Sequence, residues 1–379
     1  MKGSLRRVVR CVRPGALAAV LLLAVGCDGF FVKEGTGGTV PGNTGSYAYV
    51  SNPAGSSTSL AAYSLTTGTL APVAGSPFPL GFVPAALSVT PASTFLYAAT
   101  NSPGFTGIYA YTIAPSTGAL TLANGGKLVA ALTVAAMDIS PDGKYLVVLN
   151  LDGSSLNEYS IDPLTGLLTF AATVTYATPT GTVVTPSAVK ITPSGAFVVC
   201  ALGTAGDLIF PYNAGTINPA FVSLATGSNS SGDYSLALDN SNFLYVARTT
   251  GLAVYSLSTA GVPTAVVGSP FSTGTTPRSV VINKSSVYVA NLRSGTISAF
   301  SIASTGALTI LPGSPYDSVT SASVLGVDNS GKYLLALGYD KNIGLQMYAI
   351  GAGGGLTPVL STVATGTVAT VPAIMALTH

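Results

Sequence analysis

The stretch Val287-Tyr288-Val289-Ala290-Asn291 is one of seven copies of a short apolar pattern that recurs along the chain. In each copy an aromatic or aliphatic residue precedes small apolar residues, and successive copies lie 48, 49, 52, 47, 43 and 46 residues apart. The copies start at Tyr49, Tyr97, Leu146, Val198, Tyr245, Tyr288 and Leu334. A repeat of this length, built of short strands and turns, predicts an all-β fold, a seven-bladed β-propeller of four-stranded antiparallel blades.

Each repeat predicts four strands joined by tight turns, with the pattern above as the second strand. A turn such as Ser140-Pro141-Asp142-Gly143-Lys144 precedes it, because Pro presets φ and Gly tolerates the left-handed region. The third strand carries an aromatic residue before Ser or Thr, as at Tyr159-Ser160, and a Thr-Gly turn follows, as at Thr165-Gly166. We interpret these motifs as turn and packing devices rather than binding sites.

The two ends of the repeat region predict how the ring closes. The region begins with a second strand, Tyr47 to Asn52, and finishes with an innermost strand, Pro372 to Leu377. These two strands complete one blade only if the C-terminal strand pairs with the N-terminal blade, which also removes exposed sheet edges. Residues 47–379 are therefore predicted to form one propeller domain.

The N-terminal residues 1–26 have the pattern of a secretion signal. A basic region precedes an apolar core, Ala16 to Val25, that is too short to span a bilayer. Leu23 to Cys27 resembles the lipobox of bacterial lipoproteins, which implies lipidation of Cys27 and a flexible Gly/Thr-rich tether over 27–46. Secretion without lipidation is one alternative, and twin-arginine export through Arg6-Arg7 is another.

Charge and cysteine usage exclude several classes of function. Without residues 1–26 the chain keeps ten basic and 13 acidic residues, a net charge of −3, so we expect no nucleic-acid partner. Cys200 lies in an apolar strand and would be the one thiol left beside Cys27, so we interpret it as a small buried hydrophobe. No spacing of His, Cys or acidic residues predicts a metal site, and no motif predicts a cofactor.

The Tyr-Val-x-Asn anchors and the Ser-Pro-Asp-Gly-Lys-Tyr turn at 140–145 resemble those of a known family. This family is the lactonase group of seven-bladed propellers, which includes bacterial 6-phosphogluconolactonases, together with the broader group named for YVTN repeats. The resemblance covers residues 47–379 and implies the propeller fold. Its implication for activity is weaker, because many extracytoplasmic members have no known reaction.

The sequence departs from the family where its catalytic residues would stand. Active members resemble one another in a Pro-Arg-His segment followed by a strand that ends in Asn-Glu. Here Arg278 and Asn291 keep their places, whereas Ser279 stands in place of the His and Leu292 in place of the Glu. Since lactone opening needs a proton acceptor, we expect the family reaction to be lost. Neither His379 nor the glutamates Glu34 and Glu158 is expected to replace it.

The arginines give one further signal. We hypothesise that they form an anion-binding patch near the central channel, flanked by two aspartates, because the fork of Arg suits carboxylate or phosphate. The residues of this patch are Arg248, Arg278, Arg293, Asp233 and Asp317. The alternative is that they are solubilising loop charges that pair with neighbouring aspartates.

Together these patterns predict a lipid-anchored propeller of the bacterial cell envelope that binds or scaffolds rather than catalyses. Its partners would be the membrane, through lipid on Cys27, and an anionic small molecule or an envelope protein. The sequence does not distinguish this binding role from a structural role in surface assembly or adhesion. The alternative from another class is a lactone hydrolase of altered mechanism that acts on a sugar lactone.

Overall fold

The computed structural model describes residues 45–51, 58–65, 68–178, 183–224, 232–318, 321–339, 344–363 and 373–379. All of them belong to one compact unit, Gly42–His379. The predicted signal over 1–26, Cys27 and most of the tether over 27–46 lie outside the described residues. Within these ranges, no helix is both long enough and apolar enough to cross a membrane.

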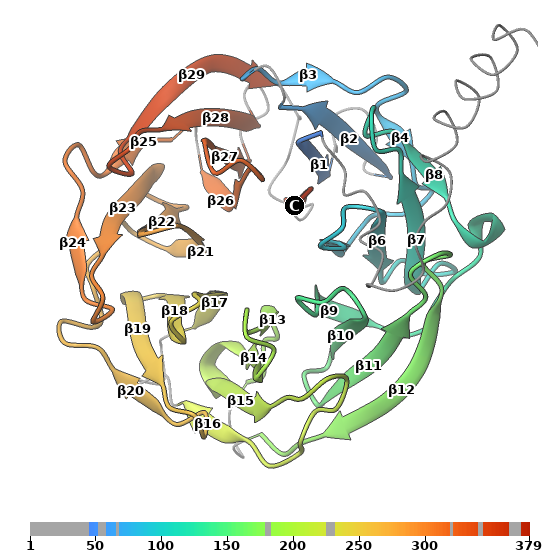
Figure 1. Ribbon diagram of the computed structural model, residues 1–379, viewed down its shortest axis with the longest axis horizontal. Coiled ribbons are helices and arrows are strands. Elements are labelled where there is room, and N and C mark those ends of the chain that lie inside the picture. Colours follow the sequence, from blue (N-terminus) through green and yellow to red (C-terminus); the bar gives the residue numbers. More distant parts are fainter. Residues whose placement is uncertain are drawn as a thin grey trace, which may run out of the picture. The chain divides into compact units, whose positions relative to one another are not determined.

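The unit is a ring of seven antiparallel sheets, which confirms the predicted β-propeller (Figure 1). Blade 1 contains, from its innermost strand outward, β30 (Met375–Leu377), β1 (Tyr47–Ser51), β2 (Ser59–Ser64) and β3 (Ala71–Pro72), with β4 (Phe78–Pro79) also paired to β2. Blade 2 contains β5 (Ala86–Val89), β6 (Phe95–Thr100), β7 (Gly107–Ile113) and β8 (Leu120–Leu122). Blade 3 contains β9 (Val134–Ile139), β10 (Tyr145–Asn150), β11 (Ser155–Ile161) and β12 (Leu168–Thr175).

The other four blades repeat this order. Blade 4 contains β13 (Ala188–Ile191), β14 (Phe197–Ala201), β15 (Asp207–Pro211) and β16 (Val222–Leu224). Blade 5 contains β17 (Asp233–Leu238), β18 (Phe243–Arg248), β19 (Gly251–Leu257) and β20 (Pro263–Ala265). Blade 6 contains β21 (Pro277–Asn283), β22 (Ser286–Asn291), β23 (Thr296–Ile302) and β24 (Leu308–Ile310), with β25 (Tyr316–Asp317) paired to β23. Blade 7 contains β26 (Ala322–Val327), β27 (Tyr333–Gly338), β28 (Leu345–Ile350) and β29 (Leu356–Val363). Two short 3-10 turns lie in loops of other blades, η1 (Asn124–Gly126) after β8 and η2 (Gly203–Ala205) after β14.

The predicted closure of the ring is confirmed, since β30 is the innermost strand of blade 1. It pairs antiparallel with β1, placing Ala376 opposite Tyr49. The Thr378 N–H donates to the Tyr47 carbonyl at 3.0 Å, and the Tyr47 N–H donates to Thr378 Oγ1 at 2.8 Å. The observed strand begins at Met375, later than the predicted start at Pro372, which lies outside the described residues.

The hydrophobic core lies between neighbouring blades. One cluster joins Ile108 and Tyr97 of blade 2 to Leu146 and Met137 of blade 3, and the six others join residues of adjacent blades in the same way. The second strand of a blade is buried on both faces, and every residue of β6 is buried. This explains why the second strands are continuous apolar runs in the sequence instead of alternating ones.

The repeated Tyr and Thr-Gly motifs are two halves of one contact between blades. The Tyr97 hydroxyl in blade 2 donates to the Gly166 carbonyl in blade 3 at 2.9 Å, and the Phe95 ring packs where a Cβ on Gly166 would stand, 2.6 Å from that position. Gly166 has φ of 70°, a conformation that Gly adopts at little cost. The same hydrogen bond joins Tyr49 to Gly118 and Tyr288 to Gly354.

We expect Tyr97→Phe to lower the free energy of unfolding by about 1 kcal/mol, since it leaves the Gly166 carbonyl without its donor. Denaturant unfolding of both proteins measures this change. Tyr145→Phe is the control. The Tyr145 ring packs against Gly215 of the next blade in the same way as the Phe95 ring packs against Gly166, so the equivalent position in blade 2 is already a Phe. An equal loss in both variants would show that the Tyr97 hydrogen bond does not stabilise the blade contact.

Candidate functional site

Three neighbouring innermost strands begin with the same irregularity at one end of the channel. In blade 5, Asp233 pairs with Arg248 and Ser235 with Ala247, so Tyr234 is an extra residue with no partner across the ladder. Blades 6 and 7 repeat this β-bulge, with Arg278 and Ser323 as the extra residues. A bulge re-aims the side chain of the extra residue, and here all three side chains line one cavity.

Two residues just before the bulges have a strained backbone. Thr276 has φ of 59° and Ser321 has φ of 61°, and each stands two positions before the bulged residue of its blade. Positive φ is unusual for a β-branched residue such as Thr. Residues held in this conformation cluster at functional sites because the surrounding structure must over-determine them. Both residues line the same cavity as the bulged side chains.

The cavity is an open depression of about 870 Å³ at the end of the channel where the bulged strands begin. Its lining contains two arginines, six hydroxyl side chains and three apolar residues. These residues are Arg278, Arg293, Ser187, Tyr234, Thr276, Ser321, Ser323, Tyr339, Leu292, Val324 and Ala373. None of these lining residues is acidic, so within the described part of the chain the cavity has an excess of positive charge that favours an anion.

Arg278 is the best placed of these groups to bind a ligand. The carbon at the centre of its guanidinium lies 3.9 Å from the centroid of the Tyr234 ring, in cation–π contact. Its Nε is buried and has no hydrogen-bond partner among the described residues. A buried donor without a partner is costly, and an anion in the cavity would supply the missing acceptor. Arg293, which is exposed, provides a second positive charge in the same lining.

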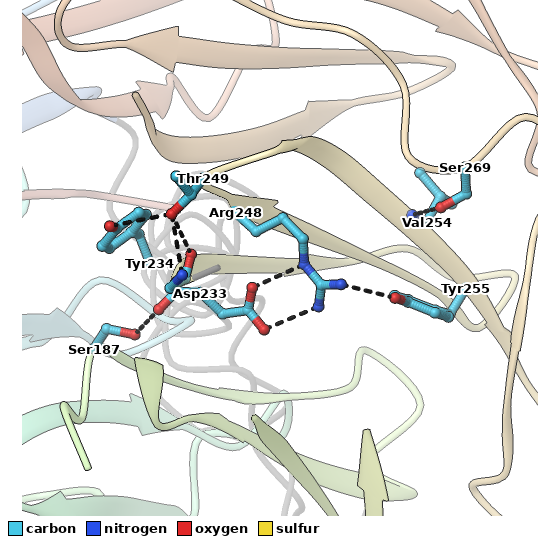
Figure 2. Close-up of polar contacts among 9 residues, drawn as sticks. Ser187, Asp233, Tyr234, Arg248, Thr249, Val254, Tyr255 and Ser269 are labelled. Atoms are coloured by element: carbon cyan, nitrogen blue, oxygen red, sulfur yellow. Dashed lines mark hydrogen bonds and ion pairs between the residues drawn. The ribbon is translucent and has the colours of Figure 1, made fainter. Parts of the chain in front are cut away.

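Arg248 and Asp233, which the sequence placed in the same patch, instead face each other in a buried ion pair (Figure 2). Arg248 Nε and Nη2 donate to the two carboxylate oxygens of Asp233, each at 2.9 Å, and Nη1 donates to the Tyr255 hydroxyl at 3.1 Å. Arg248 is 5% exposed and Asp233 is fully buried. Arg248 is thus paired with a neighbouring aspartate, as under the alternative expectation, but the pair is buried rather than a solubilising loop charge, and neither residue belongs to the cavity lining.

Asp317 is not part of the cavity lining, and no ion pair joins it to either arginine among the described residues, although β25 pairs with β23 directly after the turn that carries Arg293. It is exposed in the short strand β25, and its backbone carbonyl accepts a hydrogen bond from the Tyr348 hydroxyl at 2.8 Å. The structure thus places Arg278 and Arg293 in one cavity lining, pairs Arg248 with Asp233 outside that lining, and places Asp317 on β25 beside the turn that carries Arg293. Sequence reasoning missed Tyr234 and Ser323, since no motif distinguishes a bulged residue from its neighbours.

Ser279, in place of the family's His, joins two blades. Its hydroxyl accepts a hydrogen bond from the Leu325 N–H of blade 7 at 3.0 Å, and the residue is 7% exposed. Ser235 makes the corresponding contact with the Val280 N–H at 3.2 Å. Leu292, in place of the family's Glu, presents an aliphatic side chain to the cavity. The two positions therefore supply a structural contact and an apolar wall.

The groups weighed as alternative catalysts lie elsewhere. His379 lines a second cavity of about 770 Å³ at the other end of the innermost strands, where Lys190 and Asp138 form an ion pair at 2.9 Å. Glu158 is 1% exposed in β11, and burial raises the pKa of its carboxyl. Burial raises the pKa of the Cys200 thiol to about 12. Within the described ranges, no three His, Cys, Asp or Glu side chains gather as metal ligands.

The architecture defines a class of proteins, the seven-bladed propellers with four-stranded blades and a central channel. Solved structures of lactonase-like propellers share this fold. One is a protein from Bacteroides fragilis assigned as a 6-phosphogluconolactonase, with a TM-score of 0.71 and 18% identity over 89% of this chain and 99% of that one. A second such protein, from Bacteroides uniformis, has a TM-score of 0.70 and 16% identity over 88% and 99%.

A periplasmic gluconolactonase from Pseudomonas aeruginosa is similar as well, with a TM-score of 0.68 and 16% identity over 89% of this chain and 99% of that one. Neither a protein-family model nor a curated protein matches the sequence. At these identities the similarity establishes the fold alone, which is the fold that the resemblance implied.

Proposed function

We propose that the protein is a binding module for a small anionic molecule, which it holds in the cavity lined by Arg278 and Arg293. The observation that carries this proposal is the environment of the Arg278 guanidinium. Its guanidinium is stacked on Tyr234, its buried Nε has no partner among the described residues, and it faces a lining in which those residues supply no negative charge. The hydroxyls of the lining add donors for the polar part of a ligand.

The same lining argues against lactone hydrolysis as the main function. Attack by water on a lactone needs a group that accepts a proton near the reacting carbon. The described residues of the lining include no carboxylate, imidazole or amine, and the Ser279 hydroxyl is engaged by the Leu325 N–H. The arginines could still stabilise an oxyanion, so the cavity retains binding chemistry without a base.

We further propose that the module is exported and anchored in the bacterial cell envelope. The sequence pattern of residues 1–26 and the lipobox-like segment ending at Cys27 support this location. The Pseudomonas aeruginosa gluconolactonase of similar fold is periplasmic, which is consistent with this location. The membrane would then be one partner, through lipid on Cys27, and the other would be the anion or an envelope protein that carries one.

The second candidate function is a lactone hydrolase of altered mechanism that acts on a sugar lactone. The likeness of the fold to the gluconolactonase favours it, and so do Arg278 and Asn291, which keep their family places. Under this alternative, the arginines would bind the substrate and a group outside the described lining would accept the proton.

We expect Arg278→Gln to weaken anion binding about tenfold or more, because it replaces a charged donor pair by a neutral amide. Isothermal titration calorimetry of the mature chain with sulfate and with a panel of carboxylates measures this. Lys284→Gln is the matched control, since it removes one exposed positive charge at the opposite end of the same innermost strand. Equal affinity in Arg278→Gln and wild type would exclude the cavity, and turnover of a sugar lactone by the wild type would favour the second candidate.

A further inference from the structure

Outside the cavity lining, two buried aspartates from neighbouring blades lie close to one arginine, which is bonded to only one of them. Asp207 is the first residue of β15 in blade 4, and Asp233 is the first residue of β17 in blade 5. Both are fully buried. Arg248 binds both oxygens of Asp233. No donor among the described residues reaches either oxygen of Asp207.

The balance of buried charges determines which of the two aspartates carries a proton. One buried cation balances one buried carboxylate, and a second uncompensated carboxylate would cost several kcal/mol. Since Arg248 is bonded to Asp233, charge balance favours the negative charge on Asp233 and a protonated, neutral Asp207. The side chains of Asp207 and Asp233 are within hydrogen-bonding reach of each other, so as an acid Asp207 can donate its proton to the Asp233 carboxylate, which gives both groups a partner.

The acid pair adjoins the residues that shape the cavity. The Asp233 carbonyl accepts a hydrogen bond from Ser187 Oγ at 2.8 Å, and Ser187 lines the cavity. Tyr234, the bulged residue under Arg278, follows Asp233 directly. Thr249 follows Arg248, and its Oγ1 accepts a hydrogen bond from the Gly232 N–H at 3.0 Å. The same Oγ1 lies 3.4 Å from the Tyr234 hydroxyl oxygen (Figure 2). The start of β17 is therefore held on both sides of Asp233, by Ser187 and by Thr249. We call these contacts, together with the Arg248–Asp233 ion pair, the clamp.

We propose that Asp207 is a positioning residue for the anion cavity: as a neutral acid bonded to Asp233, it completes the clamp that holds Tyr234 beneath Arg278. This inference rests on the proposed anion-binding function. Asp207 does not touch the ligand. It acts through Asp233 and the β-bulge, so its effect on the site depends on whether it carries a proton.

The groups that face Asp207 determine the direction of the effect. They are Asp233 on β17, Arg248 on β18, Tyr255 on β19 and Cys200 on β14. Burial raises the pKa of Asp207 well above its usual range, Asp233 raises it further, and Arg248 lowers it. Above the raised pKa, a second negative charge competes with Asp233 for Arg248, and the clamp loosens. Anion affinity is therefore expected to fall as pH rises through that pKa, and binding at that pH takes up protons.

Sulfate tests this coupling, because its own charge is constant from weakly acidic to alkaline pH. We expect the wild type to bind sulfate progressively more weakly as pH rises through the Asp207 titration. Asp207→Asn, a neutral isostere whose amide can still donate to Asp233, should bind with nearly constant affinity over the same range. Parallel losses of affinity in the two proteins would overturn the proposal.

A second measurement needs no ligand, so it separates failure of this inference from failure of the anion site. The chain has no Trp, so Tyr234→Trp introduces a single fluorescent reporter at the bulge. Its emission should shift with pH in the Tyr234→Trp protein and stay constant in the Tyr234→Trp/Asp207→Asn protein. The same shift in both would contradict the proposal even if sulfate binds. If the two proteins differ while sulfate fails to bind the wild type, the positioning role stands and the anion site is wrong.

Discussion

Deletion of Ala373–His379 is expected to open the ring and to lower the melting temperature by roughly 10 °C or more. The deletion removes β30, so blade 1 loses its innermost strand and β1 becomes an unpaired edge. It also removes Thr378, whose hydroxyl and N–H bond Tyr47, and Ala376, which belongs to the cluster between blades 1 and 2. Since no disulfide joins the described residues, this pairing is the closure of the ring.

Calorimetric melting of the truncated protein measures the effect, and removal of His379 alone is the control. His379 is exposed, and its N–H bonds the Ser93 hydroxyl without adding to the β30–β1 ladder. A truncated protein that melts at the temperature of the wild type would show that the ring is held by its blade contacts alone.

Arg248→Met is expected to lower the free energy of unfolding by about 3–5 kcal/mol at neutral pH. The substitution keeps an apolar side chain of similar length but leaves the Asp233 carboxylate buried without its cation. Part of the loss should be recovered as pH falls. Without Arg248 the folded-state pKa of Asp233 rises further, and protonation then removes the uncompensated charge.

Chemical denaturation across a pH series measures this change. The comparison is the triple variant Asp207→Asn/Asp233→Asn/Arg248→Met, which removes the charges together and should recover most of the stability at neutral pH. A loss below about 1 kcal/mol in Arg248→Met, or the same loss in the triple variant, would show that the ion pair is not desolvated as its burial indicates.

The sequence was sufficient for the architecture because the fold repeats. Seven similar units predict seven blades, and a region that starts at a second strand and ends at an innermost one predicts closure through β30. The Tyr and Thr-Gly motifs were correctly interpreted as packing devices. Their partnership, as in Tyr97 with Gly166, was not visible because the two halves lie in different repeats.

The site was only partly predictable, for two physical reasons. Spacing along the repeat places loop charges at one end of the channel, but it does not say which are buried, so Arg248 and Arg278 looked alike in the sequence. A β-bulge also shifts the register of a strand by one residue and leaves no sequence signal here, which is why Tyr234 and Ser323 were not anticipated. The departure at Ser279 was visible, and the structure adds its role in joining blades 6 and 7.

The most direct test of the anion cavity is a crystal structure of the mature protein soaked in selenate, which anomalous scattering locates without ambiguity. Our account predicts selenate within hydrogen-bonding distance of the Arg278 guanidinium, with its Nε among the donors and Arg293 nearby. An empty cavity, with Arg278 Nε bonded to another protein group, would contradict it.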